Sequence, residues 1–316
     1  MINIPELRVF VMAAEELNFS RAAERLHLSQ SAVSQNIQAI ERLYRTELFV
    51  RHGRSVQLSD VGLKILPMAR EVLNTTHILE DTLSNVNGEI SGDLTIACAT
   101  TSGRYFIPSL LASFQQEFPH VRTRLSLMSR QKVLDELLTQ TLNLGVVGRY
   151  TEHRELECQL MLEDRIILIV PPNHPWSRVE KVKLEDVMEQ PFITREINSG
   201  TFELLYDSVR QVGLNPKNFK VIMQLGNAEA VEMAVENGIG VTFISEMMAA
   251  RSLALGRVKQ VLVEDFNVTQ QVYLVRHISR NFIQAEEKLW NYVSLHNDLA
   301  ANLMLSLSDV SHSGAF

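Results

Sequence analysis

The stretch NFSRAAERLHLSQSAVSQNIQAIERLY, residues 18–44, decides how the first part of the chain folds. Small and apolar residues recur in it at the spacing of two short helices, separated by a tight turn at His27 to Ser29. We expect Ser20 to cap the first helix and Ser29 the second, because a serine N-cap accepts a hydrogen bond from the first helical turn. Histidine tolerates the positive φ of such a turn. The stretch therefore predicts a helix-turn-helix.

One face of the second helix carries uncharged side chains that form hydrogen bonds. Opposite the apolar positions lie Gln30, Ser31, Ser34, Gln35 and Gln38. A face that only meets water more often carries lysine and glutamate, whereas glutamine pairs with adenine edges and serine with bases or phosphates. The face predicts DNA contact, and a polar surface without a partner is the alternative. Ser20, Arg21 and Ser29 join it as candidate contacts.

A wing follows this helix. In ELFVRHGRSVQLSDVG, residues 47–62, we predict strands at 48–51 and 55–58 around a turn at Gly53. Arg51 and Arg54 are candidate phosphate contacts, and ordinary surface arginines are the alternative. Residues 21–54 hold six arginines and three glutamates, a surplus of three positive charges, although the chain has a net charge of -7. This local basic character suits a DNA-binding module.

A long helix is predicted next, from a cap at Ser59 to about Asn87, with Pro67 tolerated at a cost. Its apolar seam has heptad spacing and comprises Ile65, Ala69, Val72, Thr76, Leu79, Leu83 and Val86. Such a seam needs a partner helix, which a second copy of the chain supplies. Packing against the chain's own second domain is the alternative. Asn87-Gly88 ends the helix and opens a hinge.

From Gly92 the pattern alternates strands and helices, which predicts an α/β region with a mostly parallel sheet. Two hydroxyl-rich segments each follow a strand and precede a helix: Thr100, Thr101, Ser102 and, later, Ser199, Gly200, Thr201. Hydroxyls and free N–H groups at a helix N-terminus bind anions, and Arg195 adds charge pairing. The alternative is that both segments serve only as helix caps.

Bulk properties narrow the class of protein. A chain of 316 residues, 46% hydrophobic and 21% charged, predicts two or three globular domains. Neither a membrane-length apolar run nor a signal peptide is evident, and two cysteines fit a reducing cytoplasm. Motifs of metal, nucleotide and serine-nucleophile enzymes are lacking, so we expect a protein that is not an enzyme and uses no cofactor or metal.

Residues 1–65 closely resemble the winged helix-turn-helix of LysR-type transcriptional regulators. The resemblance rests on LRVFVMAAEELNFSRAAERLHLSQSAVSQNIQAIERLYRTELFVR and LSDVG. It implies that the helix containing SQSAVSQNI enters the major groove, with contacts at Gln30, Ser31, Ser34 and Gln35. Many members have proline at the position of Ser31 and arginine at that of Gln35. The resemblance thus does not imply the guanine contact of that arginine, but it still implies that the helix docks in the major groove.

The rest of the chain resembles the LysR-type effector domain, which is similar to periplasmic binding proteins. Marker strings are IPSLLASFQQEFP, LNLGVVG, PPNHPWS, TREINSGT and AVENGIGVTFIS. The resemblance implies two lobes joined by crossing strands, which we place near Leu162–Arg165 and Val263–Asn267. It also implies a ligand cleft that is often lined by the positions of Thr100, Thr101, Ser129, Thr194 and Thr201. TREINSGT is similar to the branch that regulates carbon fixation and sulfur or nitrogen assimilation, although Ile197-Asn198 replaces its proline-glycine.

These inferences give a domain plan. We expect a DNA-binding domain at 1–59, a linker helix at 60–87, an effector domain at 88–300 and a tail at 301–316. Lobe I would comprise 91–162 and 267–300, and lobe II 165–263. The expected function is that of a cytoplasmic LysR-type regulator with double-stranded DNA, a small effector and its own copies as partners, as a dimer or tetramer. A contact with RNA polymerase stays open, and no membrane is expected. A repressor or architectural protein without a ligand is the alternative.

Overall fold

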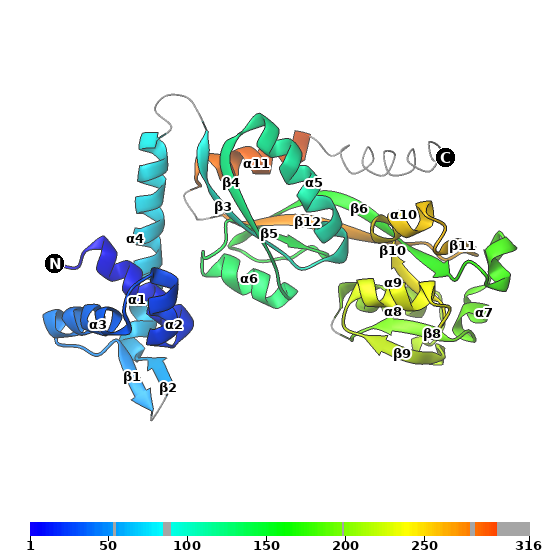
Figure 1. Ribbon diagram of the computed structural model, residues 1–316, viewed down its shortest axis with the longest axis horizontal. Helices are drawn as coiled ribbons and strands as arrows, with labels where there is room; N and C mark the ends of the chain where they lie inside the picture. Colours follow the sequence, from blue (N-terminus) through cyan, green and yellow to red (C-terminus); the bar gives the residue numbers. More distant parts are fainter. Residues whose placement is uncertain (53–54, 85–89, 198, 279–281, 296–316) are drawn as a thin grey trace.

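The computed structural model describes residues 1–52, 55–84, 90–197, 199–278 and 282–295. It consists of a helical head, a long helix and a two-lobed α/β unit (Figure 1). The head and the long helix comprise α1 (Ile4–Glu16), α2 (Phe19–Leu26), α3 (Gln30–Tyr44), β1 (Phe49–His52), β2 (Ser55–Leu58) and α4 (Asp60–Ser84). The predicted helix-turn-helix and wing are confirmed in type and order.

Local hydrogen bonds explain where the helices of the head begin. Asn18, and not the predicted Ser20, caps α2: its Oδ1 accepts from the backbone N–H groups of Ser20 at 2.9 Å and Arg21 at 3.2 Å. The prediction is wrong because the helix begins earlier, at Phe19, whose side chain is buried in the head. Ser29 caps α3 as predicted, with Oγ 3.1 Å from the N–H of Ala32. His27 has the expected positive φ, 55°.

The long helix α4 begins as predicted, because Ser59 Oγ accepts from the N–H of Gly62 at 3.0 Å. Its predicted seam is wrong at the first two positions. Ile65 and Ala69 pack against the core of their own head, where the helix spans its base. The later members Val72, Leu79 and Leu83 are 44%, 59% and 64% exposed. The part of the predicted seam that does not pack against the head therefore begins at Val72.

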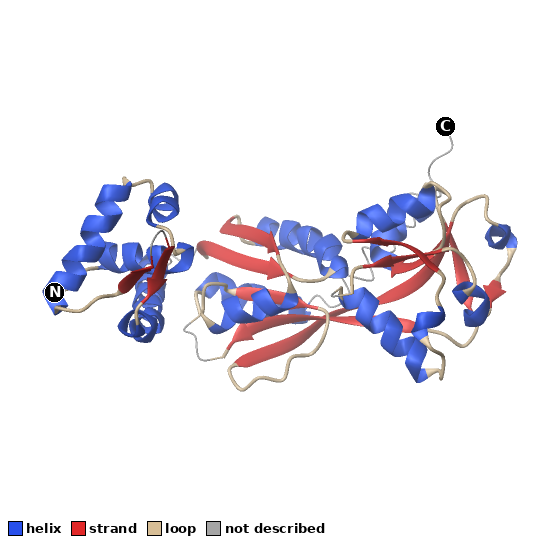
Figure 2. Cartoon of the chain, turned by 90° about the horizontal axis from the view of Figure 1, so that it is seen from below, coloured by secondary structure: helices blue, strands red, loops and turns tan. Residues whose placement is uncertain are grey.

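The two-lobed unit contains the remaining elements, seen from below in Figure 2. They are β3 (Ser91–Cys98), α5 (Thr101–Glu117), β4 (His120–Leu127), α6 (Arg130–Leu138), β5 (Leu144–Val147), β6 (Leu156–Val170), β7 (Lys181–Val182), α7 (Leu184–Met188), β8 (Phe192–Arg195), α8 (Gly200–Gln211), β9 (Val221–Leu225), α9 (Ala228–Glu236), β10 (Thr242–Ser245), α10 (Glu246–Ala254), β11 (Lys259–Val263), β12 (Val268–His277) and α11 (Gln284–Leu295). The α/β class is confirmed.

The large sheet has the order β4-β3-β5-β12-β6-β11-β7, with β10 also paired to β6. It is mixed, and the expectation of a mostly parallel sheet is wrong. β3 pairs in parallel with β4 and β5, but β12 is antiparallel to β5 and β6, and β6 is antiparallel to β10 and β11. β6 and β12 run in opposite directions between the lobes (Figure 1), and β10 and β11 of lobe II also run opposite to β6.

The buried clusters locate the crossings between the lobes. On β6, Leu162 belongs to the core of lobe I and Ile166 to that of lobe II, which agrees with the predicted first crossing. On β12, Val268 packs in lobe II and Val272 in lobe I. The predicted second crossing at Val263–Asn267 is thus too early. That segment is largely the turn between β11 and β12.

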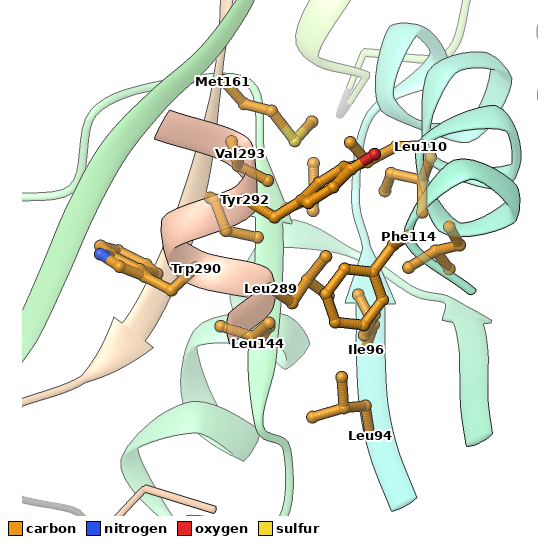
Figure 3. Packing of buried hydrophobic residues seen from close by; sticks show 14 of the residues in the cluster. Leu94, Ile96, Leu110, Phe114, Leu144, Met161, Leu289, Trp290, Tyr292 and Val293 are labelled. Atoms are coloured by element: carbon orange, nitrogen blue, oxygen red, sulfur yellow. The ribbon is translucent and has the colours of Figure 1, made fainter. Parts of the chain in front are cut away.

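Lobe I is held by a core in which α11 packs over the sheet (Figure 3). Phe114 of α5 is fully buried and meets Tyr292 of α11 edge-on, with ring centroids 5.4 Å apart. Leu289 and Trp290 of α11 belong to the same buried cluster, and Trp290 points away from Phe114, with Arg276 Cζ 4.1 Å from its ring centroid. Because α11 follows β12, the last described helix packs on lobe I, whose first strands are β3 and β4.

Some predicted features lie outside the described residues. They are Gly53, Arg54, Val86, Asn87, Gly88, Asn198 and the tail at 301–316. The side chains of Arg51 and Ser102 are likewise not described, although both residues lie within assigned elements. Among the residues that are described, no helix is both long and apolar enough to cross a membrane.

Replacing Phe114 by alanine should lower the free energy of unfolding of lobe I by about 3–5 kcal/mol, because it removes a buried ring and leaves a cavity. Differential scanning calorimetry would show the transition of the two-lobed unit at a lower temperature. Leu160→Ala is the control, since Leu160 is 42% exposed. Equal shifts for both variants would contradict the assigned core.

Candidate functional site

The predicted DNA-facing surface is formed by α3. Gln30, Ser31, Gln35 and Gln38 are exposed, and Ser34 is half-buried. Val33, Ile37 and Ile40 on the opposite side are buried in the head. The structure thus places all five polar side chains on the outer side of one helix. Ser31 Oγ lies 2.8 Å from Ser29 Oγ, so the cap and the face are connected.

Two arginines flank this surface. Arg42 lies one turn beyond Gln38 and donates from Nε to the Gln38 carbonyl oxygen at 3.1 Å. Arg42 was not among the candidates from sequence, although its four-residue spacing from Gln38 was an available signal. Arg21 at the start of α2 donates from Nη2 to the carbonyl oxygen of Glu16 at 3.0 Å and stays largely exposed.

The two hydroxyl-rich segments cap helices in opposite lobes. Thr100 Oγ1 accepts from the N–H of Gly103 at 2.8 Å at the start of α5. Ser199 Oγ accepts from the N–H of Phe202 at 3.1 Å at the start of α8. Capping leaves the remaining N–H groups of each first turn without a helical acceptor, and the helix dipole adds positive potential there. Both ends can therefore bind an anion as well as act as caps.

A hydrogen bond joins the two lobes beside the α5 helix end. Arg195, at the end of β8 in lobe II, donates from Nη1 to Thr101 Oγ1 of lobe I at 3.4 Å. The hydroxyl-bearing side chains of the two ends that the structure describes are buried, together with one on β8: Thr100, Thr101, Thr194, Ser199 and Thr201. Ser129 caps α6 and is exposed, so the structure does not bring it into this buried group.

Gln270 lies between the two ends and was not found from sequence. It lies on β12 and is only 3% exposed. A Cβ atom added to Gly148 of lobe I would lie 2.5 Å from Gln270 Nε2, and one added to Gly200 of lobe II would lie 3.4 Å from it. Its amide therefore occupies the space that these two glycines leave open. A polar residue at a buried strand position in VTQQVYLV was the available signal.

A buried carboxylate lies opposite Gln270 on the crossing strands. Asp164 of β6 is its register partner and is 1% exposed. Asp164 accepts from Ser245 Oγ at 2.5 Å and from the N–H of Met247 at 3.2 Å, at the start of α10. Directly opposed residues of an antiparallel pair share one face of the sheet. The cleft residue Gln270 and the carboxylate that holds α10 are therefore neighbours.

Ion pairs bridge the two lobes at two places. Arg104 of α5 lies 2.9 Å from Glu229 of α9, and Tyr105 donates to the same carboxylate at 3.2 Å. Arg149, after β5, lies 3.0 Å from Asp207 of α8. Beside Arg149 is a cavity of about 340 Å³ whose lining includes Gly148, Leu204 and Gln270. These bridges hold the lobes in contact, and sequence spacing gave no sign of them.

The charges at the cleft are already paired within the chain. Arg195 donates to the carboxylate of Glu196 at 2.8 and 2.7 Å. Burial raises the pKa of Glu196, but the hydrogen bonds and charge of Arg195, with the charge of Arg104, lower it by more. Burial, reinforced by Glu229, raises the pKa of Tyr105 to about 12. The carboxylate of Glu196 is thus kept ionised and the Tyr105 phenol kept protonated.

Comparisons with known proteins give a family. Residues 4–63 match the model of the bacterial regulatory helix-turn-helix protein, lysR family, and residues 87–295 match that of the LysR substrate binding domain. The RuBisCO operon transcriptional regulator of Allochromatium vinosum is 31% identical over 274 residues, which cover 87% of this chain and 89% of that protein.

Solved structures share the fold. Full-length OxyR from Pseudomonas aeruginosa, solved as a variant with one cysteine replaced by aspartate, superimposes with a TM-score of 0.71 at 19% identity and covers 95% of each chain. The regulatory domain of CcmR from Synechocystis, solved in complex with 2-PG, gives a TM-score of 0.58 at 21% identity and covers 65% of this chain and 97% of that one. The winged head joined to a two-lobed domain is thus an arrangement that other proteins also have.

Gly148→Ala should destabilise the two-lobed unit by about 1–3 kcal/mol, because the new methyl group forces the buried Gln270 amide to move. Gly226→Ala is the matched control, since a Cβ there meets nothing within 4 Å. Urea unfolding would measure both. A Gly148→Ala variant as stable as the control would show that the amide does not fill this space.

Proposed function

The chain belongs to the LysR family of transcriptional regulators, and from that premise we propose which residues bind DNA and which bind the effector. Members of this family bind DNA and regulate transcription, so the chain is a regulator and not an enzyme. We propose that it reads promoter DNA with the outer face of α3 and senses a small anion between its lobes. The observation that carries the second part is the hydrogen bond between Arg195 of lobe II and Thr101, at the N-terminus of α5 in lobe I.

For DNA, the proposed base contacts are Gln30, Ser31, Ser34 and Gln35. Their exposure on one helix face supports this assignment, since that face has no role in the head's core. Gln38, Ser20, Arg21 and Ser29 are proposed at its margins. Arg42 is proposed as a phosphate contact, with Arg51 and Arg54 at the wing, because each arginine neutralises one backbone charge.

For assembly, we propose that two copies pair through the exposed half of α4. Val72, Leu79 and Leu83 are large apolar side chains with helical spacing and little intrachain contact. Pairing would bury them and place two heads for two half-sites, as a dimer or as half of a tetramer. A cytoplasmic location follows from access to DNA, and a contact with RNA polymerase is proposed as the route to transcription.

For the effector, we propose a carboxylate or phosphate compound held by Thr100, Thr101, Thr194, Arg195, Ser199, Gly200 and Thr201, with Ser102 and Ser129 at the margin. Two positive helix ends favour an anion. Arg195 is already paired with Glu196 through Nε and Nη2, so it would contribute a further N–H from Nη1 and not an unpaired charge. The solved CcmR regulatory domain has 2-PG bound, which supports a small metabolite for this fold. Binding between the lobes would change their angle, and with it the spacing of the DNA heads and the bend of the promoter.

A regulator that acts without a ligand is the alternative. It would not need five buried hydroxyl side chains and a buried amide between two lobes. Thr100 and Ser199 would then act only as helix caps, and thermal shift with small organic anions separates the two functions.

Gln35→Ala should weaken operator binding by about 1–3 kcal/mol and relax base preference at one position, because it removes a bidentate contact to a base edge. Competition binding with a randomised operator library measures both quantities. Gln131→Ala is the control, since Gln131 lies on α6 of lobe I. Unchanged affinity and specificity for Gln35→Ala would contradict the base contact.

Thr101→Val should abolish the effector response and leave DNA affinity unchanged, because it removes a hydroxyl from the lobe contact and keeps the side-chain volume. Thermal shift with a panel of small organic anions, followed by DNA binding with any hit, is the measurement. Thr139→Val on the surface of lobe I is the control. A variant that keeps the full response would remove Thr101 from the site.

A further inference from the structure

The ion pair of Arg104 and Glu229 lies at the outer end of the proposed anion site. Arg104 is three residues beyond Thr101 on α5, hence about 5 Å further along the same side of the helix. Glu229 faces it from the first turn of α9 in the other lobe. A ligand whose anionic group lies at Thr101 and whose carbon chain extends along α5 would therefore place a group about three carbon atoms away next to this pair.

Each partner of the ion pair keeps one buried polar atom without a hydrogen bond within the described part of the chain. These atoms are Nε of Arg104, a donor, and Oε2 of Glu229, an acceptor. The two side chains meet through one Nη1–Oε1 contact, so the second arm of each stays unused. Unsatisfied buried polar groups are costly, and a ligand group that satisfies both is favoured.

The chemistry of the two atoms limits that ligand group. A hydroxyl both accepts from an N–H and donates to a carboxylate, whereas a carboxylate only accepts and an ammonium only donates. A hydroxyl is therefore the smallest group that serves Arg104 Nε and Glu229 Oε2 together.

Charge argues against a second anionic group at this end. The charged side chains that act on one another here are Arg104, Arg195 and Arg257 with Glu196, Glu229, Glu232 and Glu236, which sum to 3 − 4 = −1. Glu232 Oε1 is also buried without a hydrogen bond from a described residue. Burial, and then the charges of Glu236 and Glu229, raise the pKa of Glu232, which is the expected response to crowded negative charge. A second carboxylate would add to that repulsion.

We propose that Arg104 and Glu229 determine effector specificity by selecting a small anion that carries a hydroxyl group about three carbon atoms from its anionic end. The proposal rests on the anion site at Thr101 and adds the chemistry of the ligand's other end. Tyr105 acts as a positioning residue, because its hydroxyl holds Glu229 Oε1 and leaves Oε2 to the ligand.

Isothermal titration calorimetry on the full chain with three phosphate esters of similar size tests this. Glycerol 3-phosphate should bind at least about tenfold more tightly than propyl phosphate, which has the same carbon skeleton without hydroxyls. Phosphoethanolamine, which carries an ammonium, should lie between them. Equal binding of all three overturns the hydroxyl subsite and leaves the anion site standing. If no ester binds, this proposal falls, whereas the anion site is judged separately by the carboxylates of the anion panel.

Variants assign the preference to the two residues. Glu229→Met should reduce the ratio of the two dissociation constants from about ten to about one, because it removes the acceptor. Arg104→Lys retains the charge and the ion pair but lacks the Nε–H, and should reduce the ratio at least threefold even if Glu229→Met folds poorly. Glu185→Gln, an exposed change of charge on α7, should leave it unchanged. A full preference in Glu229→Met and Arg104→Lys, with melting temperatures like wild type, would overturn the proposal.

Discussion

The antiparallel pairing of β6 with β12 is the constraint on which the two-lobed unit depends. Their register runs from Val268↔Ile166 to His277↔Leu156, with one irregularity between Val272 and Tyr273. Both strands enter both cores, so neither lobe has a complete sheet without them. Gln270, which faces both lobes, is the third register position of this pair, opposite Asp164. A change in the angle between the lobes must therefore appear as a twist or bend of two hydrogen-bonded strands, which stays small because the ladder keeps its bonds.

Polar groups at that crossing connect the cleft to the rest of the unit. Gln270 faces the glycines of both lobes, and its register partner Asp164 holds the start of α10. α10 in turn places Met247 in the core of lobe I, although the helix belongs to lobe II in sequence. A ligand that moves the Gln270 amide thus acts next to the carboxylate that fixes α10. Coupling between the Gln270 amide and α10 requires only that the contacts between them can adopt two alternative arrangements.

Local patterns were enough to predict the head, the wing, the long helix and the two helix ends of the cleft. They failed where the position of a cap, a packing partner or a crossing depended on contacts with residues distant in sequence. Asn18 and Ser20 are both good N-caps two residues apart, and only the burial of Phe19 decides between them. The spacing of Ile65 and Ala69 suits a seam with a second copy as well as packing within the chain, but in the structure both pack against the core of the head. The position of the second crossing, the cross-lobe ion pairs and Gln270 depend on which strand pairs with which, and no spacing in one segment specifies that.

The placement of Met247 has a consequence for the modularity of the sensor. The chain leaves lobe I along β6 and returns along β12, so lobe II is in effect an insertion into lobe I, a topology that invites exchange of one sensor lobe for another. Met247, however, belongs to lobe II in sequence but fills space in the core of lobe I. A transplanted lobe would need a side chain of matching volume at this position, or the host core would be left with a cavity. In proteins that arise by such an exchange, the ligand-facing loops vary freely, whereas the residue at position 247 and the lobe I core around it change only together.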